Sequence, residues 1–275
     1  MLRFAVAGSP LSTPSPGGTV EGIKQASELG ISAMEIEWVQ RVPDAPKRME
    51  EIKAVSKELN IILTVHAPYF VNLNAKEPEK LEASKKRILK ALEMAELAGA
   101  ISVCVHPAFY LGMEPEIAFK NVQKATADIM KQKSKLFPSV NLAFETMGKG
   151  TQFGSLEEVL KISKEFAIYP CVDLAHLHAR TNGGYNSASE FNEVFDVYEK
   201  FLGKKSLKSM HLHYSGIEYT AKGERRHLVL NKSDANWKDY LKVLKKRSIG
   251  GVLVCESPSL EEDTILLQNT FKKLR

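Results

Sequence analysis

The sequence lacks long hydrophobic runs and paired-cysteine motifs. No stretch approaches the roughly 18 consecutive apolar residues of a membrane-spanning helix, and the apolar part of the N-terminal MLRFAVAGSP is too short for a secretory signal. The three cysteines, Cys104, Cys171 and Cys255, each lie inside an apolar run, and no CxxC spacing occurs. Buried thiols in a reducing compartment are therefore expected rather than disulfides. A cytoplasmic location without membrane association is predicted.

A glycine-rich phosphate loop is also absent. The segment after the first apolar run, residues 7–18, contains no GxGxxG, which disfavours an open doubly wound sheet that binds a dinucleotide. Of the 275 residues, 44% are hydrophobic and 26% charged, as in a globular protein with a sizeable core. The net charge of +5 permits a polyanionic partner without predicting one.

Strand-like apolar runs alternate with amphipathic segments along the whole chain. Strict alternation implies a parallel sheet with right-handed crossovers, and eight units predict closure into an α/β barrel of the (β/α)8, or TIM, type. No linker divides the chain, so one domain over residues 1–275 is predicted. Ser155 with Glu158 and Ser259 with Glu262 fit helix capping boxes. The runs cover residues 2–8, 33–39, 61–67, 101–107, 141–146, 169–175, 207–213 and 251–257, and the last helix is expected over 260–273.

Most of these runs end in a side chain that can bind a metal. One histidine after an apolar run is usually an ordinary core or surface residue, but six such coincidences point to one site at the C-terminal face of the barrel. Imidazole and carboxylate donors suit Zn²⁺, Mn²⁺ or Fe²⁺ better than Ca²⁺ or Mg²⁺. The donors exceed the need of one tetrahedral ion, which predicts two metals about 3.5–4 Å apart and a bridging carboxylate. The strings VHAPY, CVHP, AFET, VDLAH, MHLHY and VCESP supply His66, His106, Glu145, Asp173 with His176, His211 with His213, and Glu256.

These strings, in this order, resemble the signature segments of the endonuclease IV family. HAPYFVNL, VHPAFYLG, AFETMGKGTQFG, VDLAH, MHLH and VCESP carry the resemblance, which places the chain in the wider group of barrels similar to xylose isomerase. Members of that family cut DNA on the 5′ side of abasic sites with a cluster of three zinc ions. The resemblance therefore implies a zinc-dependent phosphodiesterase, with Mn²⁺ or Fe²⁺ as alternative metals. It implies double-stranded DNA with abasic sites as the partner, and a monomer is expected.

The resemblance also implies a role for each ligand. His66, His106 and Glu145 would hold the first metal. Glu145, as the catalytic residue, would bridge to the second metal and face the attacking water. The second metal would be completed by Asp173, His211 and Glu256, and the third would be held by His176 and His227.

One position departs from the family pattern. The third metal normally has an aspartate two residues before the last histidine, whereas this chain has Arg225 there. A cation cannot bind a metal and repels it, which puts the third site in question. Glu224 and His213 are the alternative donors.

A second enzyme class fits part of the same pattern. Glu145, Asp173, His211 and Glu256 also resemble the single-metal site of ketose 3-epimerases and related sugar isomerases. Glu35 and Glu37 alternate along the second run and share one side of it, so they are candidates for moving protons. Such enzymes do not need His66 and His106 as ligands, so the phosphodiesterase is favoured and the isomerase or epimerase is the alternative.

Three residues near the strand ends are candidates for contacting DNA. Tyr69 follows His66 on a loop, where it either stacks in a duplex from which a nucleotide is extruded or packs on its own loop. Arg41 follows the second run, and Lys149 lies in the turn beside Glu145.

Overall fold

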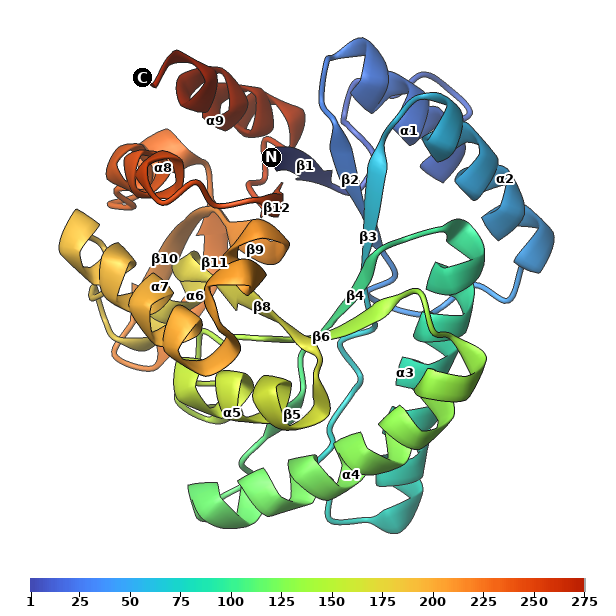
Figure 1. Cartoon of the computed structure of the whole chain (residues 1–275), viewed down its shortest axis with the longest axis vertical. Coiled ribbons are helices and arrows are strands. Elements are labelled where there is room, and N and C mark those ends of the chain that lie inside the picture. Colours follow the sequence, from blue (N-terminus) through green and yellow to red (C-terminus); the bar gives the residue numbers. More distant parts are fainter. Residues whose placement is uncertain (275) are drawn as a thin grey trace.

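The chain folds into a closed barrel of eight parallel strands, seen in a computed structural model that describes residues 1–274 (Figure 1). All eight predicted strands form, and the barrel closes where the first strand pairs with the last. Going round the barrel, the order is β1-β12-β9-β8-β6-β4-β3-β2, which follows the chain. The predicted (β/α)8 fold is confirmed. The strands are β1 (Leu2–Ala7), β2 (Ala33–Glu37), β3 (Ile62–His66), β4 (Ser102–Val105), β6 (Asn141–Glu145), β8 (Tyr169–Asp173), β9 (Met210–Tyr214) and β12 (Gly251–Cys255).

Helices surround the strands (Figure 1). The capping box predicted at Ser155 forms at the start of α5. The one predicted at Ser259 is wrong, because α9 begins at Glu261 without a side-chain cap and the Ser259 backbone N–H donates to Ser257 instead. Among residues 1–274, no helix combines the length and apolar character that crossing a bilayer requires. The helices are α1 (Thr19–Glu28), α2 (Pro46–Glu58), α3 (Pro78–Ala98), α4 (Pro115–Leu136), α5 (Leu156–Phe166), α6 (Leu174–Arg180), α7 (Ala188–Leu202), α8 (Trp237–Lys246) and α9 (Glu261–Lys273), with short 3-10 turns η1 (Lys204–Lys208) and η2 (Leu230–Lys232).

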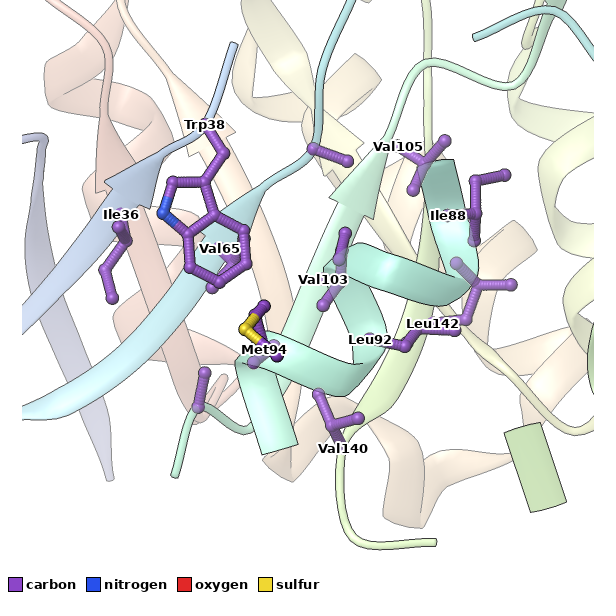
Figure 2. Close-up of a cluster of buried hydrophobic side chains, with 14 of the residues drawn as sticks. Ile36, Trp38, Val65, Ile88, Leu92, Met94, Val103, Val105, Val140 and Leu142 are labelled. Atoms are coloured by element: carbon purple, nitrogen blue, oxygen red, sulfur yellow. The ribbon is translucent and has the colours of Figure 1, made fainter. Parts of the chain in front are cut away.

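The main core lies between the strands and the helices. Figure 2 shows part of it, where Ile88, Leu92 and Met94 of α3 lie against Val65 and Val103 of the barrel. These side chains are at most 1% exposed, and burying each stabilises the fold by about 1.5–3 kcal/mol. This packing fixes the strands, and with them the side chains at the strand ends.

Two small antiparallel sheets of two strands each stand at the C-terminal edge of the barrel, and the sequence patterns did not predict them. One pairs β5 (Ala108–Phe109) with β7 (Gln152–Phe153), and the other pairs β10 (Gly216–Thr220) with β11 (Gly223–Leu228). Both lie in loops that follow barrel strands, so they rise from the end where the predicted ligands lie.

Candidate metal centre

Most of the predicted ligands meet at one end of the barrel because they lie at or just after the carboxyl ends of parallel strands. Glu145 is at the centre of the group and is fully buried. Its Oε2 lies 3.0 Å from His106 Nε2 and 3.4 Å from His66 Nε2. The structure therefore brings together the three side chains expected at the first metal.

The other carboxylate oxygen of Glu145 faces a second set of donors. Oε1 lies 3.4 Å from His213 Nδ1, which is also 3.4 Å from Glu256 Oε2. Glu145, Asp173, His213 and Glu256 each offer a ligand atom, and these four atoms lie within 4.8 Å of one another. One carboxylate thus joins two groups of donors.

His213 occupies the place expected for His211, which is a correction to the predicted second group. The two residues are two apart on β9, so both point into the barrel, but His211 is one step further from the mouth. There its Nε2 lies 2.9 Å from Glu35 Oε2 and its Nδ1 lies 2.9 Å from Ser102 Oγ. Both nitrogens of His211 are engaged, whereas His213 Nδ1 is free to face the centre.

Backbone carbonyls select which nitrogen three of the histidines present. Nδ1 of His66 donates to Ala67 O at 2.8 Å, Nδ1 of His176 to Thr146 O at 3.0 Å, and Nδ1 of His227 to Glu256 O at 3.1 Å. A carbonyl can only accept, so Nδ1 of each ring carries a proton and Nε2 is the nitrogen that can offer a lone pair to a metal. Histidines that bind metals are held in this way in other proteins.

The buried donor atoms are not satisfied by the protein itself. Within residues 1–274, Glu145 Oε1, Asp173 Oδ2, His213 Nδ1 and Glu256 Oε2 are buried without a hydrogen bond, as is His66 Nε2. The Nδ1 atom of His176, which already donates to Thr146 O, lies 3.0 Å from Glu145 Oε1 and 3.3 Å from Asp173 Oδ2. Leaving each such atom unpaired costs about 1–3 kcal/mol, and more for a charged group. Convergent, unpaired oxygen and nitrogen donors fit a divalent transition metal in both number and chemistry.

The charges of the group also favour a cation. Burial raises the pKa of Asp173 well above its usual range; His176 opposes this, and the Glu256 and Glu145 carboxylates add to it. Burial alone would lower the pKa of His66, but the adjacent Glu145 and Glu37 carboxylates raise it to about 10. Without metal, protons therefore take the place of the missing positive charge.

A third group of donors, His176, Glu224 and His227, forms at the hairpin β10–β11, and Arg225 does not face it. Arg225 Nη1 points away to Glu218 at 2.6 Å, and the Arg225 side chain is 64% exposed. Glu224 takes the place of the family's aspartate, with Oε2 3.6 Å from His176 Nε2 and Oε1 4.0 Å from His227 Nε2. Arg225 is therefore directed away from these three donors.

A β-bulge explains how Glu224 reaches the group. Residues three apart on a regular strand face opposite sides. In β11, Glu224 pairs with Tyr219 while Arg226 pairs with Glu218, so Arg225 is an extra residue. The bulge brings Glu224 and His227 to the same side.

The family model described as "Xylose isomerase-like TIM barrel" matches residues 23–273. The chain belongs to this family. A protein of Methanocaldococcus jannaschii named uncharacterized protein MJ0133 is 38% identical over 274 residues, 100% of this chain and 98% of that protein. A Shouchella clausii protein named "Probable endonuclease 4" is 27% identical over 224 residues, 75% of this chain and 74% of that protein.

Solved structures of two kinds share the fold. Endonuclease IV of Thermus thermophilus superposes with a TM-score of 0.74 at 21% identity, over 98% of this chain and 97% of that one. A D-tagatose 3-epimerase-like protein superposes with a TM-score of 0.71 at 17% identity, over 98% and 96%. The fold alone therefore does not separate a nuclease from a sugar epimerase.

The rim of this family member carries exposed aromatic side chains. Tyr69 is 49% exposed, and its ring centroid lies 5.1 Å from those of His66 and His106. It lines a surface pocket with Phe70 and Phe109. Sequence reasoning named Tyr69 and missed the other two, although both follow metal-binding strings in HAPYF and HPAF.

The predicted basic residues lie apart from each other. Lys149 lines a groove with Arg180, Lys222 and Arg225 on the side of the third group. Arg41 is exposed in the loop after β2, and it is not among the residues that line either of these surfaces. Arg180 was also missed; its Nη1 donates to Lys149 O at 2.6 Å and so supports the turn beside Glu145.

Proposed function

We propose that this protein is a metal-dependent phosphodiesterase that cuts the DNA backbone on the 5′ side of abasic sites. The observation that carries the proposal is the placement of Glu145, whose two carboxylate oxygens each face a separate set of donors. A bridging carboxylate between metals is the arrangement used to hold both the attacking and the leaving oxygen of a phosphodiester. The third group, His176, Glu224 and His227, offers ligand atoms for a further metal. The similarity to an endonuclease 4 supports the same conclusion.

Zinc-class ions bound here would supply the Lewis acidity that lowers the pKa of water and stabilises the departing 3′ oxygen. The protein's own residues fix the geometry. Glu145 sets the separation of the two groups, and the carbonyls of Ala67, Thr146 and Glu256 hold the imidazoles with Nε2 inward. Tyr69 and its aromatic neighbours offer a surface on which the bases or sugars beside an extruded nucleotide can stack.

One observation favours the alternative, a sugar isomerase or epimerase. Glu37 is a buried carboxyl group, and burial raises its pKa to about 8, partly opposed by His66 and reinforced by Glu35. A carboxyl group with a pKa near neutrality suits general acid–base catalysis. Glu35, the other candidate proton carrier, is instead held between His211 and His213, 2.9 Å from each.

Incision of a duplex with a single abasic analogue, run beside a panel of ketoses, separates the two functions. We expect zinc- or manganese-loaded protein to incise 5′ to the lesion, and Glu145→Gln to lose more than about 100-fold of the rate while keeping its circular dichroism spectrum. Turnover of a ketose without incision would overturn the proposal.

Lesion recognition is tested by binding. Tyr69→Ala should reduce the preference for the abasic duplex over an intact one more than it reduces affinity for either. Leu136→Ala is the matched control, because Leu136 is a similarly exposed apolar residue at the end of α4. Affinity should fall steeply with salt, by about a hundredfold between about 50 and 200 mM if about four phosphates are neutralised.

A further inference from the structure

The interior of the barrel below the centre carries thiols where such barrels usually hold branched aliphatic side chains. Cys104 of β4 and Cys171 of β8 lie on the two strands that flank β6. Together with Ala143 of β6 they form a small cluster, and all three are fully buried. The small Ala143 side chain leaves room for both sulfur atoms between the flanking strands.

These two thiols converge with His213. The Sγ atoms of Cys104 and Cys171 and one His213 nitrogen lie within 4.8 Å of one another. Cys104 Sγ is also 3.1 Å from Glu145 Oε2, directly beneath the centre. Both nitrogens of the fully buried His213 face carboxylate oxygens, Nε2 at 2.9 Å and Nδ1 at 3.4 Å, and neither contact has the geometry of a hydrogen bond. A buried imidazole that forms no hydrogen bond, beside two thiols and a carboxylate, is an independent sign that the cluster takes a ligand.

Strand geometry argues for a metal between the sulfurs and against a disulfide. Neighbouring strands lie about 4.7–4.9 Å apart, so residues on β4 and β8 are separated by roughly twice that distance. A disulfide needs Cα atoms within about 4.4–6.8 Å. Two thiolates at about 2.3 Å from one tetrahedral ion are about 3.8 Å apart, which the observed convergence allows.

We propose that Cys104, Cys171 and His213 bind a zinc-class ion beneath the mouth of the barrel, in a thiolate site that shares His213 with the second group at the mouth. His213 Nδ1 faces Glu145 and Glu256 at the mouth, and Nε2 lies 2.9 Å from Glu35 Oε1 below. In this proposal Nδ1 of His213 binds the metal of the second group at the mouth, and Nε2 binds the ion in the thiolate site below. Glu35 Oε1, which lies beside that nitrogen and forms no hydrogen bond, is the carboxylate oxygen available for the fourth position.

Binding of the ion releases protons to solvent. Each thiol that coordinates loses its proton, and His213 loses its ring proton if its two nitrogens bind two metals at once. No oxidant or reductant is needed. The inference concerns metal binding alone, so it holds for either reaction considered above.

Cobalt-loaded protein tests this site by spectroscopy. Thiolate bound to Co²⁺ gives an intense near-ultraviolet charge-transfer band that oxygen and imidazole ligands do not give. We expect the band in the wild-type protein, and we expect Cys104→Ser and Cys171→Ser each to lose most of it and to bind one metal ion fewer per chain. Cys255→Ser is the matched control, because Cys255 is equally buried but packs in the outer core between barrel and helices.

The outcomes separate cleanly and do not depend on nuclease activity. A band that is present in wild type and Cys255→Ser and lost in the other two variants supports the site. Absence of the band in fully loaded wild-type protein would overturn the proposal even if the serine variants failed to fold. Retention of the full band in both Cys104→Ser and Cys171→Ser would overturn it as well.

Discussion

At the scale of single residues, the candidate centre depends on which histidine nitrogens are free. Three rings are held by backbone carbonyls with Nε2 inward, and His213 presents Nδ1. His211 has the same chemistry, yet both of its nitrogens are occupied by Glu35 and Ser102. A histidine's role here follows from its partners and not from its residue type.

Paired substitutions of the two histidines on β9 test this distinction. His213→Gln should bind at least one metal ion fewer per chain, because it loses a nitrogen donor to Glu145's second group. His211→Gln should keep the wild-type metal content, measured by inductively coupled plasma mass spectrometry. The opposite pattern would return His211 to the ligand set.

Metal loading should release protons at neutral pH. In the metal-free protein the pKa of His66 is raised to about 10, so the ring is protonated at pH 7 and must lose that proton before Nε2 can bind a metal. Zinc affinity should therefore weaken as the pH falls. Titration calorimetry in buffers of different ionisation enthalpy measures the protons released. Binding that is independent of buffer would contradict the protonated state of the metal-free group.

At the scale of elements, the barrel strands position the first two groups and a hairpin positions the third. The strands were predictable, because each is an apolar run that ends in a histidine or carboxylate. The hairpin β10–β11 was not, because residues 216–228 are mixed polar residues without a clear period. Its bulge decides that Glu224 and not Arg225 faces His227, and a bulge leaves no signature in the spacing of motifs.

Substitutions on either side of the bulge check this account. Glu224→Ala should lose the metal held with His176 and His227 while the other groups stay loaded. Arg225→Ala should keep the full metal content, because the Arg225 side chain is exposed and pairs only with Glu218. Deleting Arg225 removes the bulge and leaves Glu224 and His227 two residues apart, on the same side of a regular strand, so this variant should also keep the metal. Equal metal loss in the two alanine variants would mean that Arg225 belongs to the site.

At the scale of the whole molecule, the fold collects the ends of distant segments into one mouth. Residues 66 and 256 lie far apart in sequence, yet both stand at carboxyl ends of strands in the same closed barrel. Topology therefore predicted most of the site from sequence. It did not separate His211 from His213, because both point inward and only their depth differs. It also could not separate the nuclease from the epimerase, since both kinds of enzyme share the barrel.

Anomalous diffraction at the zinc edge from zinc-loaded crystals tests the central claim most directly. We predict separate peaks on the two sides of Glu145, one beside His66 and His106 and one beside Asp173, His213 and Glu256. A single peak at the second position, with full occupancy and nothing beside His66 and His106, would contradict a bridging role for Glu145. It would leave the one-metal sugar isomerase as the better account.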